Sequence, residues 1–400
     1  METIHLKEYE TESVELCDQD IAFISRELIG KIAISRELEG RKYKLNPSQY
    51  VGLISLPSGR TIEIRPKIPI SSLFYLVAIA FELPSPFRQE LAKLERLDQI
   101  FEFIASFFAD LVEERIANGM YRWYVEREEN VPAIRGRINF SEDARRNFIS
   151  RQRTHCRFDE FTWDIPENQV IRQVVHSLSG WRFRHELRLR LARIDAELGE
   201  VARTTLSSED VKRFQYHRMN ENYRQVHQLC NLFLQNASLA EAIGTFSYRA
   251  FLLDMNKLFE EFVCQLLRNR APRRVGIQSQ ECTFLDRDNK IRMKPDILIR
   301  HKGTVVLAAD CKYKRLESDE YKNHDVYQIL AYCIATNTPQ GLLVYPKYLE
   351  DIPGDVWITR AGVHIRQVSI ELDKESRELA RSCDSFADEL LESLLIRRAA

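Results

Sequence analysis

The chain has 400 residues, 44% of them hydrophobic, which exceeds what one hydrophobic core usually serves and predicts two or three domains. Because 58 Lys and Arg balance 59 Asp and Glu, the net charge of -1 excludes a dedicated domain with a general attraction to polyanions. Any nucleic-acid contact must be local or supplied by a partner. The longest apolar run, residues 73–81, is too short to span a bilayer, and eight cysteines without a C-x-x-C pair indicate reduced thiols. We expect a cytoplasmic protein without membrane contact.

The first 70 residues contain short alternating stretches typical of strands. The clearest is at residues 51–65, where two such stretches flank Pro-Ser-Gly and predict a hairpin. The pentapeptide Ile-Ser-Arg-Glu-Leu occurs at 24–28 and again at 34–38, but two copies cannot build a solenoid, so we treat the repeat as coincidence. Apolar residues recurring every three or four positions predict a long amphipathic helix over 97–120.

The middle of the chain is rich in charge. A strand-like stretch at 121–128 is followed by helical patterns from about 165 to 240. Arg-rich stretches at 145–157 and 181–190 could follow phosphates or form solvated helix faces, and the sequence leaves both readings open. We expect three domains: a β-rich region with a long helix (1–150), a mostly helical connector (151–245) and an α/β domain (246–400).

The last third has a different order of elements: a helix over 251–270, strands over 275–285, 291–300 and 304–312, a helix over 324–335 and a strand over 341–345. This order predicts a mixed α/β sheet with a helix on each side. A tight His-Lys-Gly turn at 301–303 joins two of the strands, so they should pair antiparallel.

Three charged residues lie at the ends of those paired strands. Asp296 opens one strand, and Asp310 and Lys312 close the next. Residues two apart share one face of a strand, so the side chains of Asp310 and Lys312 should point the same way. Asp296 can approach that face across the hairpin. The pattern predicts two carboxylates and an ammonium at one point.

Such a cluster suits a metal-dependent phosphodiesterase. Carboxylate oxygens bind Mg²⁺ or Mn²⁺, which stabilises negative charge on a phosphodiester in its transition state. The preceding helix offers Glu260 or Glu261 as a further ligand, and only one of these neighbours can face the sheet. The alternative is that Asp and Lys at strand ends are solvated caps or an exposed ion pair. The order of the surrounding elements favours the catalytic reading.

The last third of the chain resembles the PD-(D/E)xK nuclease fold. It shares with that fold the order helix, three strands, helix and strand, and the motifs P-D and D-x-K. Gln328 and Tyr332, one helical turn apart, resemble the Q-x-x-x-Y motif of many of its members. That resemblance implies that both lie beside the active site and the DNA backbone. Without it, they would be read as ordinary residues of a surface helix.

A narrower resemblance covers roughly residues 50 to 345. The segments at 62–68, 135–140, 158–171 and 258–263 are similar to those of the McrC family. It implies the nuclease subunit of a modification-dependent (5-methylcytosine type) restriction system that cuts double-stranded DNA. The family's partner is an AAA+ GTPase hexamer, McrB, onto which the N-terminal part docks to stimulate GTP hydrolysis. Catalytic roles follow for Glu260, Asp296, Asp310 and Lys312.

The chain lacks a G-x-x-x-x-G-K-[ST] motif, so it should bind no nucleotide itself, and the motor must be another protein. Two other functions stay open. One is a stand-alone repair or recombination nuclease of the same fold, which near-zero net charge disfavours. The other is an adaptor that activates the GTPase without cutting, which an intact set of site residues disfavours.

Overall fold

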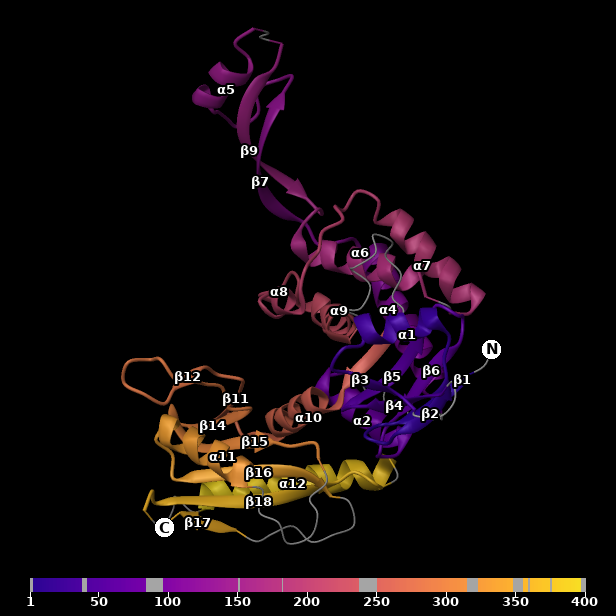
Figure 1. Cartoon of the computed structure of the whole chain (residues 1–400). Coiled ribbons are helices and arrows are strands. Elements are labelled where there is room, and N and C mark those ends of the chain that lie inside the picture. Colours follow the sequence, from indigo (N-terminus) through magenta and orange to yellow (C-terminus); the bar gives the residue numbers. More distant parts are fainter. Residues whose placement is uncertain are drawn as a thin grey trace. The chain divides into compact units, whose positions relative to one another are not determined.

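The computed structural model describes residues 3–37, 42–83, 96–149, 152–181, 183–236, 250–314, 323–347, 355–358, 360–374 and 376–396. The chain forms two compact units, 1–101 together with 250–400, and 102–249 (Figure 1). The boundary expected at 245/246 lies near the second junction. The boundary expected at 150/151 falls inside the second unit, because residues 123–131 pair with residues 154–162 across it. Both ends of the chain belong to the first unit, because the N-terminal strands join a strand from the C-terminal part.

That joining occurs in a four-stranded sheet of the first unit. Its order is β1 (Thr3–Lys7), β6 (Thr61–Arg65), β5 (Tyr50–Ser55) and β10 (Ala250–Asp254). Strands β5 and β6 are antiparallel, which confirms the predicted hairpin, and β10 adds antiparallel to the free edge of β5. The N-terminal region and the start of the C-terminal region therefore share backbone hydrogen bonds.

Gly52 permits this close approach. It lies opposite Leu252 in the β5–β10 pair and has a φ of 148°. A Cβ at this position would lie 2.0 Å from the carbonyl oxygen of Phe251, so only glycine fits. Position 52 therefore requires glycine because of β10, a strand that follows much later in the chain.

Smaller elements complete the N-terminal part. A three-stranded sheet of order β2 (Glu12–Glu15), β4 (Lys42–Pro47) and β3 (Ile32–Arg36) accompanies helices α1 (Asp18–Glu27) and α2 (Ile70–Ala80). Helix α2 is apolar nearly all round and most of its side chains are buried, which identifies it as a core helix that packs against α10.

The C-terminal part is built on a six-stranded mixed sheet. Its order is β11 (Val275–Ser279), β14 (Ile297–His301), β15 (Thr304–Cys311), β16 (Gln340–Lys347), β18 (Val363–Glu371) and β17 (Val356–Ile358). Strand β15 is antiparallel to β14 and parallel to β16, so the predicted hairpin and mixed sheet are confirmed. A separate pair, β12 (Thr283–Phe284) and β13 (Arg292–Met293), lies between β11 and β14 in the chain.

Three helices cover this sheet: α10 (Met255–Arg270), α11 (Asn323–Thr336) and α12 (Ser376–Ile396). Helix α11 packs through Ile329 and Cys333 on a face that includes Leu298 and Ala308. The intervening residues, among them Ile299 and Leu307, point to the opposite face and are also fully buried. Both faces are therefore covered, as in an α/β layered domain.

Three expected elements of this region were wrong in extent. The helix expected from residue 251 begins only at Met255, because 250–254 form β10 and Asp254 caps the helix by accepting N–H groups of Asn256 and Lys257. The strands expected over 275–285 and 291–300 are each interrupted. Gln280 has a φ of +54° and ends β11, and Pro295 lies between β13 and β14.

The second unit is helical with a β-arm. Its helices are α4 (Leu97–Asn118, which begins in the first unit), α6 (Pro166–Ser179), α7 (His185–Glu197), α8 (Ser208–Lys212), a 3₁₀ turn η1 (Glu221–Tyr223) and α9 (Arg224–Asn236). The arm consists of β7 (Trp123–Val131), β8 (Arg137–Ile138), α5 (Phe140–Arg146) and β9 (Thr154–Thr162), with β9 in the centre of its sheet (Figure 1). The long helix expected over 97–120 is confirmed as α4.

Arginines of the two Arg-rich stretches are engaged in ion pairs. Arg157 pairs with Glu126 at 3.1 Å, and Arg190 pairs with Glu113 at 2.8 Å. These pairs leave less positive charge for phosphates than the sequence suggests.

Among the helices that the structure describes, none has both the length and the apolar composition needed to cross a bilayer. All eight cysteines are free thiols.

His227 lies in the core of the second unit as a neutral side chain. It is 1% exposed, and its ring nitrogens are bonded to the Tyr216 hydroxyl at 3.0 Å and the Glu167 carbonyl oxygen at 2.9 Å. A carbonyl can only accept, so Nε2 donates to Glu167 and Nδ1 accepts from Tyr216. Burial lowers the pKa of His227 to about 4.

We predict that this histidine makes unfolding pH-dependent. The unfolded state takes up a proton on this side chain near pH 6.5, and the folded state only near pH 4. The contribution of His227 to the free energy of unfolding is therefore fully present above pH 6.5 and falls by about 1.4 kcal/mol per pH unit between pH 6.5 and pH 4. Urea unfolding followed by tryptophan fluorescence at pH 7 and pH 5 measures this. His227→Gln should flatten the dependence, whereas the exposed His185→Gln should not. Equal pH dependence in all three proteins would contradict the prediction.

Candidate active site

The β14–β15 hairpin brings two predicted carboxylates together. Asp296 directly precedes β14, and Asp310 lies in β15 beside the residue pair Ile297 and Ala309. The backbone N–H of Cys311 donates to Asp296 Oδ2 at 2.9 Å, which joins the two strand ends. Asp310 is 1% exposed, and its Oδ1 has no hydrogen-bond donor among the residues that the structure describes.

Lys312 faces Asp310 as the two-residue spacing predicts. Its Nζ lies 2.7 Å from Asp310 Oδ2 and donates to Gln328 Oε1 at 3.0 Å. Gln328 in turn donates through Nε2 to the Tyr332 hydroxyl at 2.8 Å. The structure therefore brings the four predicted residues Asp310, Lys312, Gln328 and Tyr332 into one chain of contacts. An ammonium has three N–H donors, so one remains for a substrate or a water.

Glu260 reaches the same site from α10. Gln280 Nε2 donates both to Glu260 Oε2 at 3.3 Å and to Asp296 Oδ1 at 3.0 Å, and so bridges the two acids. The neighbouring Glu261 instead accepts from Gln265 Nε2 at 3.4 Å on its own helix. Of the two glutamates that the sequence left open, the structure places Glu260 with the carboxylates.

The three acids perturb one another. Burial, followed by the charge of Asp310, raises the pKa of Glu260 to about 7. Burial and the charge of Glu260 raise the pKa of Asp296 to about 6, and burial and the charge of Asp296 raise the pKa of Asp310 to about 7. Burial lowers the pKa of Lys312, but the Asp310 carboxylate outweighs this and raises it overall, so the lysine stays charged. Perturbed groups of this kind concentrate at functional sites.

The donor set fits a divalent metal ion. No three acidic, His or Cys side chains of the described residues form a ready-made cage. Asp310, however, is a buried carboxylate whose Oδ1 lacks a hydrogen-bond donor, whose Oδ2 is paired with Lys312, and which the carboxylates of Asp296 and Glu260 repel. Oxygen ligands of this charge suit Mg²⁺ or Mn²⁺, which would relieve that repulsion. Asp296, Asp310 and Glu260 are the residues that would hold the ion.

Two residues that the sequence analysis did not single out support the site. Gln280 bridges two of the acids from a left-handed backbone conformation, which is uncommon outside glycine. Glu8, fully buried in the N-terminal part, accepts the Tyr313 hydroxyl at 2.9 Å and the Lys67 N–H at 2.6 Å. It thereby fixes the residue that follows Lys312. No local pattern marks either residue, because their partners are distant in the chain.

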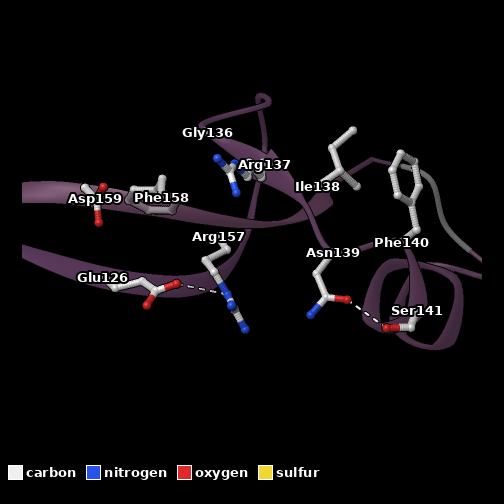
Figure 2. A pocket seen from close by; sticks show the side chains of 10 residues that line it. All are labelled: Glu126, Gly136, Arg137, Ile138, Asn139, Phe140, Ser141, Arg157, Phe158 and Asp159. Carbon is white, nitrogen blue, oxygen red and sulfur yellow. Dashed lines mark hydrogen bonds and ion pairs between the residues drawn. The ribbon is translucent and has the colours of Figure 1, made fainter.

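A hollow of about 820 Å³ lies elsewhere, in the β-arm (Figure 2). Gly136, Ile138, Phe140 and Phe158 contribute to its lining, and the charge of Arg157 there is matched by Glu126. Its lining includes two acids, Glu126 and Asp159, but no lysine, so we assign the chemistry to the carboxylate site and not to this hollow.

Comparison with known families identifies the chain. The family model described as "McrBC 5-methylcytosine restriction system component" matches residues 45–346, a range that contains every residue of the candidate site. The chain belongs to this family. The resemblance to McrC seen in the sequence is therefore confirmed.

Relatives of this McrBC component are distant in sequence. The type IV methyl-directed restriction enzyme EcoKMcrBC of Escherichia coli (strain K12) is 21% identical over 309 residues, which cover 70% of this chain and 87% of that protein. Among solved structures, an assembly of Thermococcus gammatolerans McrB AAA+ hexamers with bound McrC matches with a TM-score of 0.56 and 17% identity. The match covers 97% of this chain and 100% of that one, so the fold extends over the whole molecule.

We predict that Asp310→Asn stabilises the metal-free protein at pH 8, because it removes a buried charge that two neighbouring carboxylates oppose. The expected gain is about 2 kcal/mol in the free energy of unfolding. Mg²⁺ should raise the melting temperature of the wild type and leave that of the variant unchanged. Asp288→Asn, at an exposed aspartate, is the control. A destabilised variant, or an equal response to Mg²⁺, would refute this account.

Proposed function

We propose that the chain is the Mg²⁺-dependent endonuclease subunit of a modification-dependent, 5-methylcytosine type restriction system, with a catalytic domain of the PD-(D/E)xK type. The observation that carries the proposal is the convergence of Glu260, Asp296, Asp310 and Lys312 at the end of one β-hairpin. The family match and the methyl-directed enzyme of E. coli support it. Because its substrate would be double-stranded DNA inside the cell, we expect a cytoplasmic protein.

The site residues have separate tasks in phosphodiester hydrolysis. A divalent ion, when bound by the three carboxylates, supplies positive charge to the phosphate and acidifies water. Lys312 directs its third N–H toward the attacking water or a phosphate oxygen and stabilises developing negative charge. Gln328 and Asp310 fix the position of that ammonium. Gln280 and the Cys311 N–H hold Asp296 in place.

A protein partner fits the β-arm of the second unit. Large apolar side chains are exposed along it: Trp123, Tyr124, Ile134, Phe140, Phe148, Ile149 and Phe161. A concentration of this kind marks surfaces that another protein covers. We propose that the partner is an McrB-like AAA+ GTPase hexamer whose hydrolysis the chain stimulates. The Thermococcus gammatolerans assembly, in which McrC is bound to McrB AAA+ hexamers, supports this choice. The nucleotide would be bound by that partner.

The test of this function is cleavage of methylated and unmethylated plasmid with Mg²⁺, by the chain alone and with its AAA+ partner, with and without GTP. Cutting of methylated DNA only with partner and GTP is the expected result. Asp310→Ala should abolish cutting and leave GTP hydrolysis by the partner intact. Robust cutting by the chain alone would make it a stand-alone nuclease, and stimulated GTP hydrolysis without any cutting would make it an adaptor.

Glu260 and Glu261 form a matched pair for assigning the fourth site residue. We expect Glu260→Gln to lower the cutting rate about 10–100-fold and to raise the Mg²⁺ concentration required, because Glu260 shares its space with the other carboxylates. Glu261→Gln should change the rate less than about twofold, since its contact is with Gln265 on the same helix. The reverse order of effects would remove Glu260 from the site.

A further inference from the structure

A small β-hairpin projects from the carboxylate site. Strands β12 and β13 pair antiparallel, with Thr283 opposite Met293 and Phe284 opposite Arg292, and the residues between them form an exposed tip. Figure 1 shows this hairpin as a loop next to β11 and β14. It is the connection between those two strands, and neither the family resemblance nor the sequence pattern assigned it a role.

The base of the hairpin contacts the proposed catalytic residues. Its first leg leaves from Gln280, and its second leg ends at Asp296. The Gln280 N–H donates to the Asp296 carbonyl oxygen at 3.0 Å, and the Gln280 side chain contacts both Asp296 and Glu260. A ligand held at the base of the hairpin would therefore lie beside these acids.

Hydrogen bonds and packing against the core fix the conformation of the hairpin. The Asp286 carboxylate accepts the backbone N–H groups of Asp288, Lys290 and Ile291 at 3.1, 2.9 and 2.6 Å, which closes the turn. At the base, Met293 packs against the core beneath α11. A carboxylate committed to backbone donors is less available to neutralise nearby cations.

Its exposed charge is positive. Arg287, Lys290, Arg292 and Lys294 are all exposed, against Asp286 and Asp288, so residues 282–295 carry four cations and two anions. Lys290 pairs with Asp288 at 2.9 Å, whereas Arg287 and Lys294 make no ion pair with any residue that the structure describes. Two apolar side chains, Phe284 and Ile291, are exposed among these cations. The nearly neutral chain thus has a local positive surface at its proposed active site.

We infer that the β12–β13 hairpin binds the phosphate backbone of duplex DNA and holds it against the carboxylates. This inference rests on the proposed nuclease function and extends it to residues outside the catalytic motifs. Cations fixed on a preformed turn contact phosphates without reading sequence, which suits a subunit that does not itself choose the site. DNA affinity from such contacts depends strongly on salt.

The experiment compares two variants that each lose three positive charges. The hairpin variant is Arg287→Ser, Lys290→Ser and Lys294→Ser. The control is Arg273→Ser, Arg274→Ser and Lys302→Ser, whose residues lie at the opposite end of β14, where Val275 pairs with His301. Binding of the full chain to a fluorescent duplex is measured without divalent metal at several salt concentrations. Melting temperatures of both variants establish that they are folded.

We expect the hairpin variant to bind DNA about tenfold or more weakly, with a salt dependence reduced by about one unit of slope for each phosphate that it no longer neutralises. The control should bind as the wild type does. In plasmid cutting with the AAA+ partner, the hairpin variant should show a raised KM with little change in kcat, as expected when binding is weakened equally in the ground state and the transition state.

Equal affinity and equal KM for the hairpin and control variants, in a wild type that cuts DNA, would overturn the hairpin inference and leave the nuclease function standing. A wild type that binds duplex through the hairpin but never cuts would instead refute the nuclease function alone. A wild type that neither binds duplex at low salt nor cuts it would overturn both.

Discussion

The confinement of three acid groups and one ammonium in a largely buried space is the constraint on which this structure depends. Burial first, and then repulsion between the neighbouring carboxylates, raises the pKa of each of Glu260, Asp296 and Asp310. The compensating contacts come from separate elements: Lys312 after β15, Gln280 after β11, and Gln328 on α11. The site therefore exists only when the sheet, α10 and α11 are all in place. Bringing the three carboxylates together lowers the stability of this region, and the rigid strands around the site offset that cost.

Features with a local signal could be predicted from the sequence. The β14–β15 hairpin follows from two apolar runs joined by a tight turn, and the pairing then places Asp296 near Asp310 without further information. The side chains of Gln328 and Tyr332 meet because residues four apart share a helix face. The proximity of Glu260 to the sheet, in contrast, needed the structure. The helical period alone left Glu260 and Glu261 equivalent.

Features decided by distant residues could not be predicted. The sequence Ile-Ser-Arg-Glu is helical at 24–27 in α1, yet at 34–37 it lies mostly in β3, so neighbours in space outweigh local propensity. The sequence predicted that α10 begins at residue 251. Residues 250–254 instead form a strand, because β5 offers a free edge and Gly52 leaves room for the incoming backbone. The roles of Gln280 and Glu8 depend likewise on partners that no short segment contains.

The sharing of one sheet by β5 and β10 has a consequence for biosynthesis. Strand β5 is complete at residue 55, but its partner ends at residue 254, with the whole second unit between them. At ribosomal speeds the nascent chain would carry an unpaired strand edge for about 10–40 s. Open edges of this kind invite pairing with other chains. Until translation supplies β10, protection of that edge falls to chaperones or to transient contacts within the emerging polypeptide.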